Sequence, residues 1–580
     1  MYNSCDLHHE GRKRKQTMKE VLKKVIKKIP ALIWVALAAV LLFLNSGLRT
    51  AWAAETPAEW VGITSCVISG DNVVITGRNT GSISGSDSQF YLFELQPYED
   101  SIGARKDYIA AAPKAGEVSF TIPLNRGTTD SRLYSKFMVA VWNGETYVPV
   151  SQQAYITNPE AVAENQNPYK DPLTKKGLLI EPELMDDAFS LGVKHVIINL
   201  PFQFILGEGI DYEYEGKTYH FNQELFDRYD TIVRNMSAKD LTITAVILNS
   251  WNDATPDLYY PGTVQTEGVN YYMFNASTEA GYDYIKAIAS FLAEHYGAEG
   301  NGTISNWIIG NEINNQAWNY IGPMDVDQYV KEYERAFRVF YTAIKSTNAN
   351  ARIYFSTDYN WNNEADGSTK YNAMDVISKF NANVAAGGQM DWGLAYHPYS
   401  VPLTEPEFWD DFSTGLVTWS ADSPIVNIAN LSVLTDYFQQ PQMLTASGEV
   451  RHIILSEQGF TSTSATRGEC EELQAAAIAY AYYIVDSNPY IDAFIMSRQV
   501  DAPSEAQLSA SFGLYECDMT RTDRHVPTHR KMSYEVYRYI DRASKTLEVS
   551  EFAKSILGIE NWYDVIPNFR WEGLERRAQN

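Results

Sequence analysis

Two glutamates each stand at the end of an apolar run that has the length of a buried strand. Glu312 ends the run N-W-I-I-G-N-E, and Glu457 ends the run H-I-I-L-S-E. A carboxylic acid at one such position can donate a proton to a leaving oxygen, while a carboxylate at the other attacks the carbon that the oxygen leaves. This chemistry requires both side chains in one cleft, so the strands that carry them must end at a common edge.

The region around the two glutamates alternates between strand-like and helix-like segments. Its apolar runs cover residues 177–181, 195–200, 241–249, 306–312, 351–358, 391–399, 452–457 and 491–498. Stretches between them, such as 282–296, 326–341 and 471–485, have apolar residues at helical spacing. Eight strands alternating with helices predict a (β/α)8 barrel over residues 176–545, in which both glutamates lie at the carboxyl ends of strands, where active sites form.

An open doubly wound sheet is the alternative fold for this region. That fold normally has a Gly-rich first turn, and neither G-x-G-x-x-G nor G-x-x-x-x-G-K follows the first run. The barrel is therefore the preferred prediction. Residues 546–580 are expected to form an extension that packs on it.

The chain before the barrel has a different pattern. Residues 55–158 contain short alternating runs broken by Gly, Asn, Asp and Ser, which predict an antiparallel β-sandwich. Its role is either packing against its neighbour or binding glycans or a surface. Residues 159–175 are polar and proline-containing and read as a linker.

The first 54 residues resemble an export signal. A basic region precedes the apolar stretch 29–44, and Ala51-Trp52-Ala53 supplies the small residues that a signal peptidase accepts. The apolar stretch is short for a membrane span, which needs roughly 20 residues, although an uncleaved anchor is the alternative. We expect a secreted or cell-surface protein, associated with the membrane only if this segment stays attached.

The composition narrows the class of substrate. The net charge of −25 at pH 7 disfavours nucleic acid and other polyanions and favours neutral ligands. Aromatic residues make up 13% of the chain, and surplus Trp and Tyr in loops suit stacking against sugar rings. We expect a monomer that binds a carbohydrate.

Asn311-Glu312 and the segment S-E-Q-G-F around Glu457, with two strands between them, resemble the clan of retaining glycoside hydrolases built on (β/α)8 barrels. The resemblance covers residues 175–545. It implies that Glu312 is the acid/base, that Glu457 is the nucleophile, and that Asn311 donates a hydrogen bond to the substrate hydroxyl beside the reacting carbon. It also implies hydrolysis of a neutral poly- or oligosaccharide with retention, without a metal or organic cofactor.

The sixth run adds H-P-Y, which looks like the His-x-Tyr of this clan and implies that Tyr399 or His397 reaches the nucleophile. Two departures leave the sugar open: the second run ends N-L-P-F without the Arg of cellulase-like families, and the eighth reads I-M-S-R-Q without the usual Trp. Arg498 in that eighth run contacts either the substrate or the nucleophile, or it forms a structural salt bridge.

Four tryptophans follow predicted strands and stand beside amides or acids: Trp251, Trp318, Trp361 and Trp409. Rings that stack on C–H faces, next to amides that bind hydroxyls, suit a sugar cleft. Trp318 is the strongest candidate because it follows Glu312 closely. For the others, packing within a loop is the alternative.

Three weaker signals and one rival function complete the prediction. Residues 358–367 have calcium-loop spacing at their start but lack the Gly and the closing Glu, so no metal site is predicted. Cys470 and Cys517 follow neighbouring strands and are candidates for a bridge. His525 and His529 fit a surface turn better than a zinc motif. The rival function is a catalytically inactive carbohydrate-binding or cell-surface protein that kept the barrel.

Overall fold

The computed structural model describes residues 61–566, apart from 82, 298–299 and 364, together with 568–570 and 574. The expected export segment lies outside these residues. Among the helices of the described residues, none combines the length and the apolar character that crossing a membrane requires.

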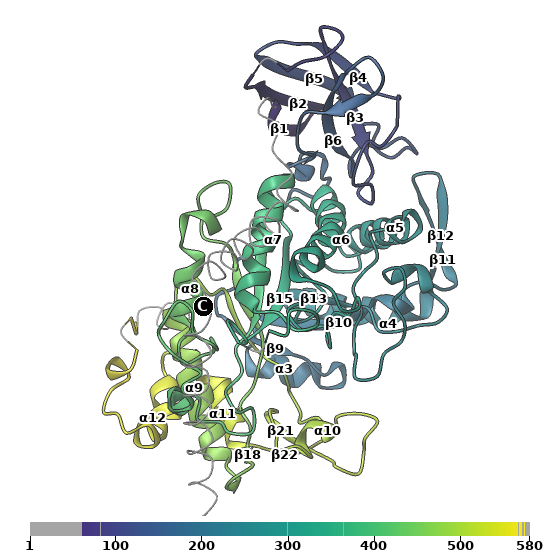
Figure 1. Cartoon of the computed structure of the whole chain (residues 1–580). Helices are drawn as coiled ribbons and strands as arrows, with labels where there is room; N and C mark the ends of the chain where they lie inside the picture. The colour runs from purple at the N-terminus through teal and green to yellow at the C-terminus, as the bar shows by residue number, and fades with distance from the viewer. Residues whose placement is uncertain are drawn as a thin grey trace, which may run out of the picture. The chain divides into compact units, whose positions relative to one another are not determined.

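Eight parallel strands close into a barrel, each paired with the next and the last with the first, which confirms the predicted (β/α)8 fold (Figure 1). In chain order the strands are β9 (Lys176–Leu179), β10 (His195–Pro201), β13 (Thr242–Leu248), β14 (Asn306–Ile309), β15 (Arg352–Asp358), β16 (Trp392–His397), β17 (Ile453–Gln458) and β20 (Ala493–Met496).

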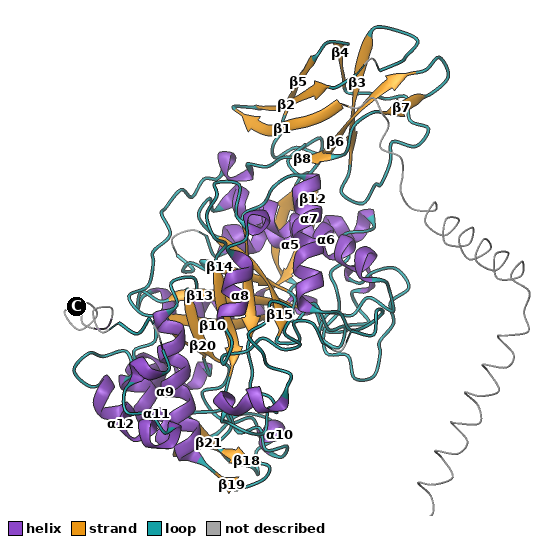
Figure 2. Ribbon diagram, turned by 60° about the vertical axis from the view of Figure 1, so that its left-hand side comes forward, coloured by secondary structure: helices purple, strands orange, loops and turns teal. Residues whose placement is uncertain are grey.

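Helices surround these strands, as Figure 2 shows in purple around orange. They are α3 (Met185–Leu191), α4 (Gln223–Ser237), α5 (Glu279–His295), α6 (Val326–Thr347), α7 (Ala373–Gly387), α8 (Ser432–Phe438), α9 (Glu471–Ser487), α10 (Pro503–Ala506), α11 (Met532–Tyr539) and α12 (Thr546–Leu557). Asp325 begins the long helix α6 by accepting hydrogen bonds from the backbone N–H groups of Asp327 and Gln328, which satisfies donors that a helix start leaves free.

The barrel strands are apolar because they are covered on both faces. Every residue of β13 is buried. Alternate side chains point inward and form one core in the barrel, to which all eight strands contribute; its members include Leu179, Ile197, Val246, Ile308, Tyr354, Ala395, Ile454 and Ile495. This packed interior holds the strand ends rigidly, so polar residues that follow them have defined positions.

The residues before the barrel form separate antiparallel sheets, as predicted. One sheet has the order β1-β2-β5, and the other has the order β4-β3-β6-β7 with β8 pairing on β6. The strands are β1 (Val61–Ser69), β2 (Asn72–Asn79), β3 (Gln89–Leu95), β4 (Ala110–Pro113), β5 (Glu117–Pro123), β6 (Lys136–Trp142), β7 (Tyr147–Pro149) and β8 (Ala154–Tyr155). Residues of β5 alternate between exposed and buried, the period expected of a strand with one covered face.

The described residues also form three β-hairpins outside the barrel sheet, which the sequence did not predict. They are β11 (Gly209–Tyr214) with β12 (Lys217–Asn222), β18 (Thr463–Ser464) with β19 (Gly468–Glu469), and β21 (Tyr515–Cys517) with β22 (Pro527–Arg530).

The suggested bridge between Cys470 and Cys517 is wrong, because both are free thiols. The sulfur of Cys470 faces the carbonyl of Thr461, and that of Cys517 lies 3.5 Å from the sulfur of Met519.

Candidate active site

The turn after β14 sets the direction of Glu312. The strand ends at Ile309, and both Gly310 and Glu312 have positive φ, 79° and 39°. This conformation is uncommon for a residue with a side chain and costs free energy. The backbone N–H of Glu312 donates a 2.8 Å hydrogen bond to Oγ of Ser356 on β15, which holds the turn in place.

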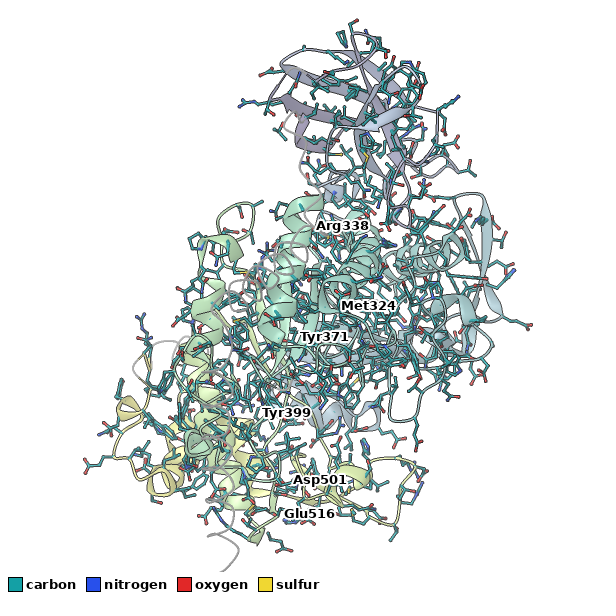
Figure 3. The ribbon with its side chains drawn as sticks, in the orientation of Figure 1. Met324, Arg338, Tyr371, Tyr399, Asp501 and Glu516 are labelled. Atoms are coloured by element: carbon teal, nitrogen blue, oxygen red, sulfur yellow. The ribbon has the colours of Figure 1, made fainter. Side chains whose placement is uncertain are left out.

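Glu457 lies on β17, and its carboxyl group is fixed by a residue that follows the neighbouring strand β16. The hydroxyl of Tyr399, which follows β16, donates to Oε1 of Glu457 at 2.8 Å. Tyr399 is buried, whereas the Glu457 side chain is 38% exposed. Figure 3 shows Tyr399 toward the same end of the barrel as Asp501, which lies in the loop after β20. Glu457 therefore combines access to solvent with a fixed hydrogen-bond donor.

His397 lies between the two glutamates. Its Nδ1 is 2.8 Å from Oε1 of Glu312 and 3.8 Å from Oε2 of Glu457. Its Nε2 is 3.0 Å from Oγ of Ser456, so both ring nitrogens are engaged. The sequence left open which member of the H-P-Y motif reaches the second glutamate; in the structure Tyr399 bonds Glu457 while His397 bonds Glu312.

The two carboxyl groups experience different surroundings. Burial raises the pKa of Glu312 from 4.5 to about 7; His397 opposes this rise through its hydrogen bond and charge, while the charges of Asp358 and Glu457 add to it. Burial alone would lower the pKa of His397, but the charge of Glu457 and the bond to Glu312 outweigh it, so the pKa of the imidazole is raised. Both shifts favour the protonated forms, so Glu312 and His397 each keep a proton to higher pH than the free side chain does.

A third carboxylate, Asp358, was missed as a site residue. It ends β15, its register partner on β16 is His397, and it is buried. Its oxygens accept from the side-chain amides of Asn314 at 2.6 Å and Asn360 at 2.9 Å. The signal was available, because Asp358 ends an apolar run as Glu312 does. Among the described residues no cluster of three or more His, Cys, Asp and Glu side chains could hold a metal ion.

An aromatic pair connects Trp318 to this site. The ring of Tyr271, in the segment after β13, lies 6.1 Å from that of Trp318. Burial raises the pKa of Tyr271, the charge of Glu457 adds to the rise, and the ring packs against the core of the barrel. Tyr271 was not predicted, although Asn270 precedes it in the sequence just as amides flank the predicted tryptophans. Asn311 precedes Glu312 directly and is half-buried.

The structure corrects one of the predicted site residues, Trp361. Its side chain is 0% exposed, its Nε1 donates to the carbonyl of Ala421 at 2.9 Å, and its ring packs edge-on against Tyr437. A ring enclosed in this way cannot stack on a sugar. The amides beside it in the sequence belong to a packed loop.

Two other predicted residues have structural partners. Trp251 is half-buried, its ring stacks on Tyr259 with centroids 4.5 Å apart, and its Nε1 donates to Asp253. Arg498 forms a two-point salt bridge with Glu505, with Nε 2.9 Å from one oxygen. Arg498 therefore forms a structural salt bridge, which was one of its predicted roles. Its positive charge also opposes the rise in the pKa of Tyr399.

Several solved structures match the chain at low identity. A family 39 glycoside hydrolase from Bacteroides cellulosilyticus WH2 is 16% identical, with a TM-score of 0.41, over 80% of this chain and 78% of that one. A family 1 β-glucosidase from Thermotoga maritima is 14% identical, with a TM-score of 0.39, over 62% and 85%. A calcium-binding mutant of Bacteroides uniformis β-glucuronidase 2 is 11% identical, with a TM-score of 0.35, over 83% and 49%.

Among curated proteins none matches the chain. One family model, described as a family of unknown function (DUF5722), matches residues 168–565, which span the barrel strands and the candidate site. Because this match covers more than half of the chain, the protein belongs to the DUF5722 family.

Proposed function

We propose that this protein is a retaining glycoside hydrolase that cleaves a neutral poly- or oligosaccharide outside the cell. The observation that carries the proposal is the position of His397, whose Nδ1 lies 2.8 Å from Glu312 and 3.8 Å from Glu457. Two carboxyl groups that face one imidazole nitrogen share one cleft. Paired carboxyl groups at the ends of barrel strands can perform both halves of glycoside hydrolysis.

In the first half-reaction Glu312 is the acid. Its proton passes to the glycosidic oxygen as the bond from that oxygen to the anomeric carbon breaks, and a carboxylate oxygen of Glu457 bonds to the same carbon. The leaving sugar departs as an alcohol. The products on the enzyme are a glycosyl ester of Glu457 and an ionised Glu312.

In the second half-reaction Glu312 is the base. It removes a proton from water while the water oxygen bonds to the anomeric carbon and the ester bond to Glu457 breaks. Two displacements at one carbon restore its original configuration. Each glutamate returns to its starting state, and no cofactor is consumed.

The different surroundings of the two carboxyl groups support these roles. Glu312 is the more enclosed, with a side chain 13% exposed against 38% for Glu457, and a pKa raised to about 7 keeps it protonated in weakly acidic solution. Tyr399 donates to Oε1 of Glu457, which holds that carboxyl group in a fixed position. One acid to donate and one carboxylate to attack is the combination that the reaction needs.

Features outside the reacting groups support the substrate class. The net charge of −25 disfavours polyanionic glycans. Trp318 and Tyr271 supply two neighbouring rings, and Asn311 is the proposed donor to the hydroxyl beside the reacting carbon. Export follows from the basic and apolar residues before Ala53, which resemble a signal peptide.

The test is activity of the purified chain on a panel of aryl glycosides and neutral polysaccharides. Glu312→Gln and Glu457→Gln should each reduce hydrolysis of the polysaccharide it cleaves by about a thousandfold or more. Glu181→Gln is the matched control, because Glu181 also follows a barrel strand but bonds His525, and it should keep full activity. Carbohydrate binding without hydrolysis of any substrate would instead favour the inactive binding protein.

A further inference from the structure

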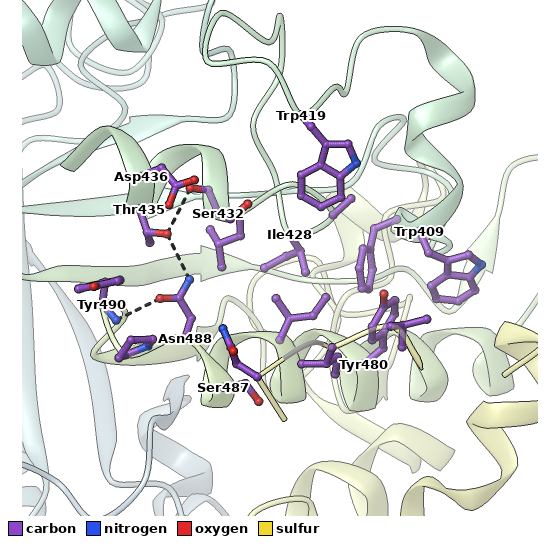
Figure 4. Close-up of a pocket in the computed structure, with 18 of the residues that line it drawn as sticks. Trp409, Trp419, Ile428, Ser432, Thr435, Asp436, Tyr480, Ser487, Asn488 and Tyr490 are labelled. Atoms are coloured by element: carbon purple, nitrogen blue, oxygen red, sulfur yellow. Dashed lines mark hydrogen bonds between the residues drawn. The ribbon is translucent and has the colours of Figure 1, made fainter. Parts of the chain in front are cut away.

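A second cavity opens on the flank of the barrel, outside the network of Glu312, His397 and Glu457. It has a volume of about 370 Å³ and lies among a 3-10 segment (Phe408–Thr414), α8, α9 and the residues Val565, Ile566 and Asn568. Figure 4 shows its two ends: Trp409, Trp419 and Tyr480 gather at one, and Asp436, Thr435 and Asn488 at the other. The volume falls within the range of pockets that bind small ligands.

The aromatic end presents ring surface to solvent. Trp419 is 65% exposed, more than any other tryptophan that the structure describes. The ring of Phe412 packs against it, with ring centroids 5.1 Å apart. The ring of Tyr480 continues this wall by stacking on Phe408. An exposed indole supported from one side leaves an apolar surface on which another flat group can lie.

The polar end supplies hydrogen-bonding groups. Asn488 donates from its side-chain amide to Thr435 at 3.4 Å, and its oxygen accepts from the backbone N–H of Tyr490 at 3.0 Å. Asp436 is exposed beside them. The residues that line the cavity include this carboxylate and neither lysine nor arginine. A polyanion is therefore disfavoured, and a purely apolar ligand would cover polar groups without bonding them.

The flank cavity lies beside chain segments that also carry candidate active-site residues. Phe408, from the 3-10 segment, lies 5.4 Å from the ring of Phe460, which follows Glu457 by three residues on the same chain segment. The loop that carries Trp409 and Trp419 begins directly after Tyr399. The cavity and the candidate active site are therefore connected through the segments that follow β16 and β17.

We propose that the flank cavity is a second, non-catalytic site for an uncharged glycan, with a sugar ring stacked on Trp419 and hydroxyl groups bonded at Asp436 and Asn488. A sugar ring matches this lining because it has C–H faces and a hydroxylated edge. The ligand class rests on the proposed function, whereas the position of the site does not. Linking two sites on one polymer raises the local substrate concentration.

The binding test uses the full chain carrying Glu457→Gln, so that no polymer is cleaved. Native electrophoresis in gels that contain β-glucan, xylan, mannan, galactan or α-glucan should show retardation by at least one polymer, and none by polygalacturonate. Adding Trp419→Ala should weaken that binding about tenfold, and Trp419→Tyr should restore part of it. Phe204→Ala is the control, because Phe204 is 52% exposed and lies outside the cavity; it should bind as the parent does.

The activity test uses the parent background. Trp419→Ala should raise KM for the polymer several-fold and leave kcat/KM for an aryl monoglycoside unchanged. Retardation that Trp419→Ala does not weaken, or retardation by none of the neutral polymers, overturns the proposal. Retardation that depends on Trp419 in a protein that hydrolyses nothing would overturn the glycosidase proposal and leave this one standing.

Discussion

His397 Nδ1 lies 2.8 Å from Oε1 of Glu312, in a pocket where both side chains are almost fully enclosed. A hydrogen bond between an imidazole and a buried carboxyl group lets the two share one proton. Because the same nitrogen is 3.8 Å from Glu457, the ionisation of one glutamate is felt by the other through this ring.

Replacing His397 should move the pH dependence of hydrolysis. His397 lowers the pKa of Glu312, so His397→Asn should raise it. Because Glu312 must be protonated to donate, the falling limb of kcat/KM should move to higher pH, with kcat/KM reduced about tenfold or more. The pH profile on an aryl glycoside measures this. His220→Asn, which removes an exposed histidine paired with Asp211, should leave the profile unchanged, and an unmoved limb in His397→Asn would contradict the assignment.

Removing the hydroxyl of Tyr399 should slow the reaction without unfolding the barrel. Tyr399→Phe keeps the ring but loses the 2.8 Å hydrogen bond to Glu457, and bonds to charged groups are worth about 1.5–3 kcal/mol, which corresponds to a loss of roughly 10- to 100-fold in kcat/KM. Tyr396→Phe is the matched control. Tyr396 is buried on β16, three residues before Tyr399, and donates to the carbonyl of Val426 instead, so it should affect stability but not the rate. Equal rates for the two variants would exclude a catalytic role for Tyr399.

Added azide should separate the roles of the two glutamates. Glu457→Gly should be inactive in hydrolysis but form a glycosyl azide of inverted configuration, because azide enters from the face that the carboxylate left. Glu312→Ala should form the azide with retained configuration from a substrate with a good leaving group. NMR of the products identifies each configuration. Inversion in the first product of the parent enzyme would mean that Glu457 is not a nucleophile.

The stability of the fold should depend on the ionisation of Glu312. Its pKa in the folded protein, about 7, lies above the usual 4.5, so the stability it contributes is complete below pH 4.5 and is lost as pH rises through 7. Glu312→Gln cannot ionise. Its melting temperature should therefore exceed that of the parent by a few degrees at pH 8 and by less at pH 5. Thermal melts at both pH values decide this, and an equal difference at the two would refute it.

The order of the barrel strands could be predicted because of a simple physical constraint. Parallel strands covered on both faces are buried throughout, as β13 is, so most of their residues are apolar and each strand appears as a nearly uninterrupted run. A polar residue that ends such a run marks the functional rim. Glu312 and Glu457 could both be predicted as site residues because each ends such a run. The same rule predicts Asp358, which also ends one.

The side-chain partners were decided by the tertiary structure alone. Whether His397 or Tyr399 bonds Glu457 depends on strand register and on the left-handed turn at Glu312, and neither has a sequence pattern. Trp361 has amides beside it in sequence, as Trp318 does, yet Trp361 is enclosed by Tyr437. The sequence by itself determined the fold class and the two glutamates, because periodicity and strand ends are local properties. Burial, hydrogen-bond partners and raised pKa values came only from the structure, because they arise where segments distant in the chain meet.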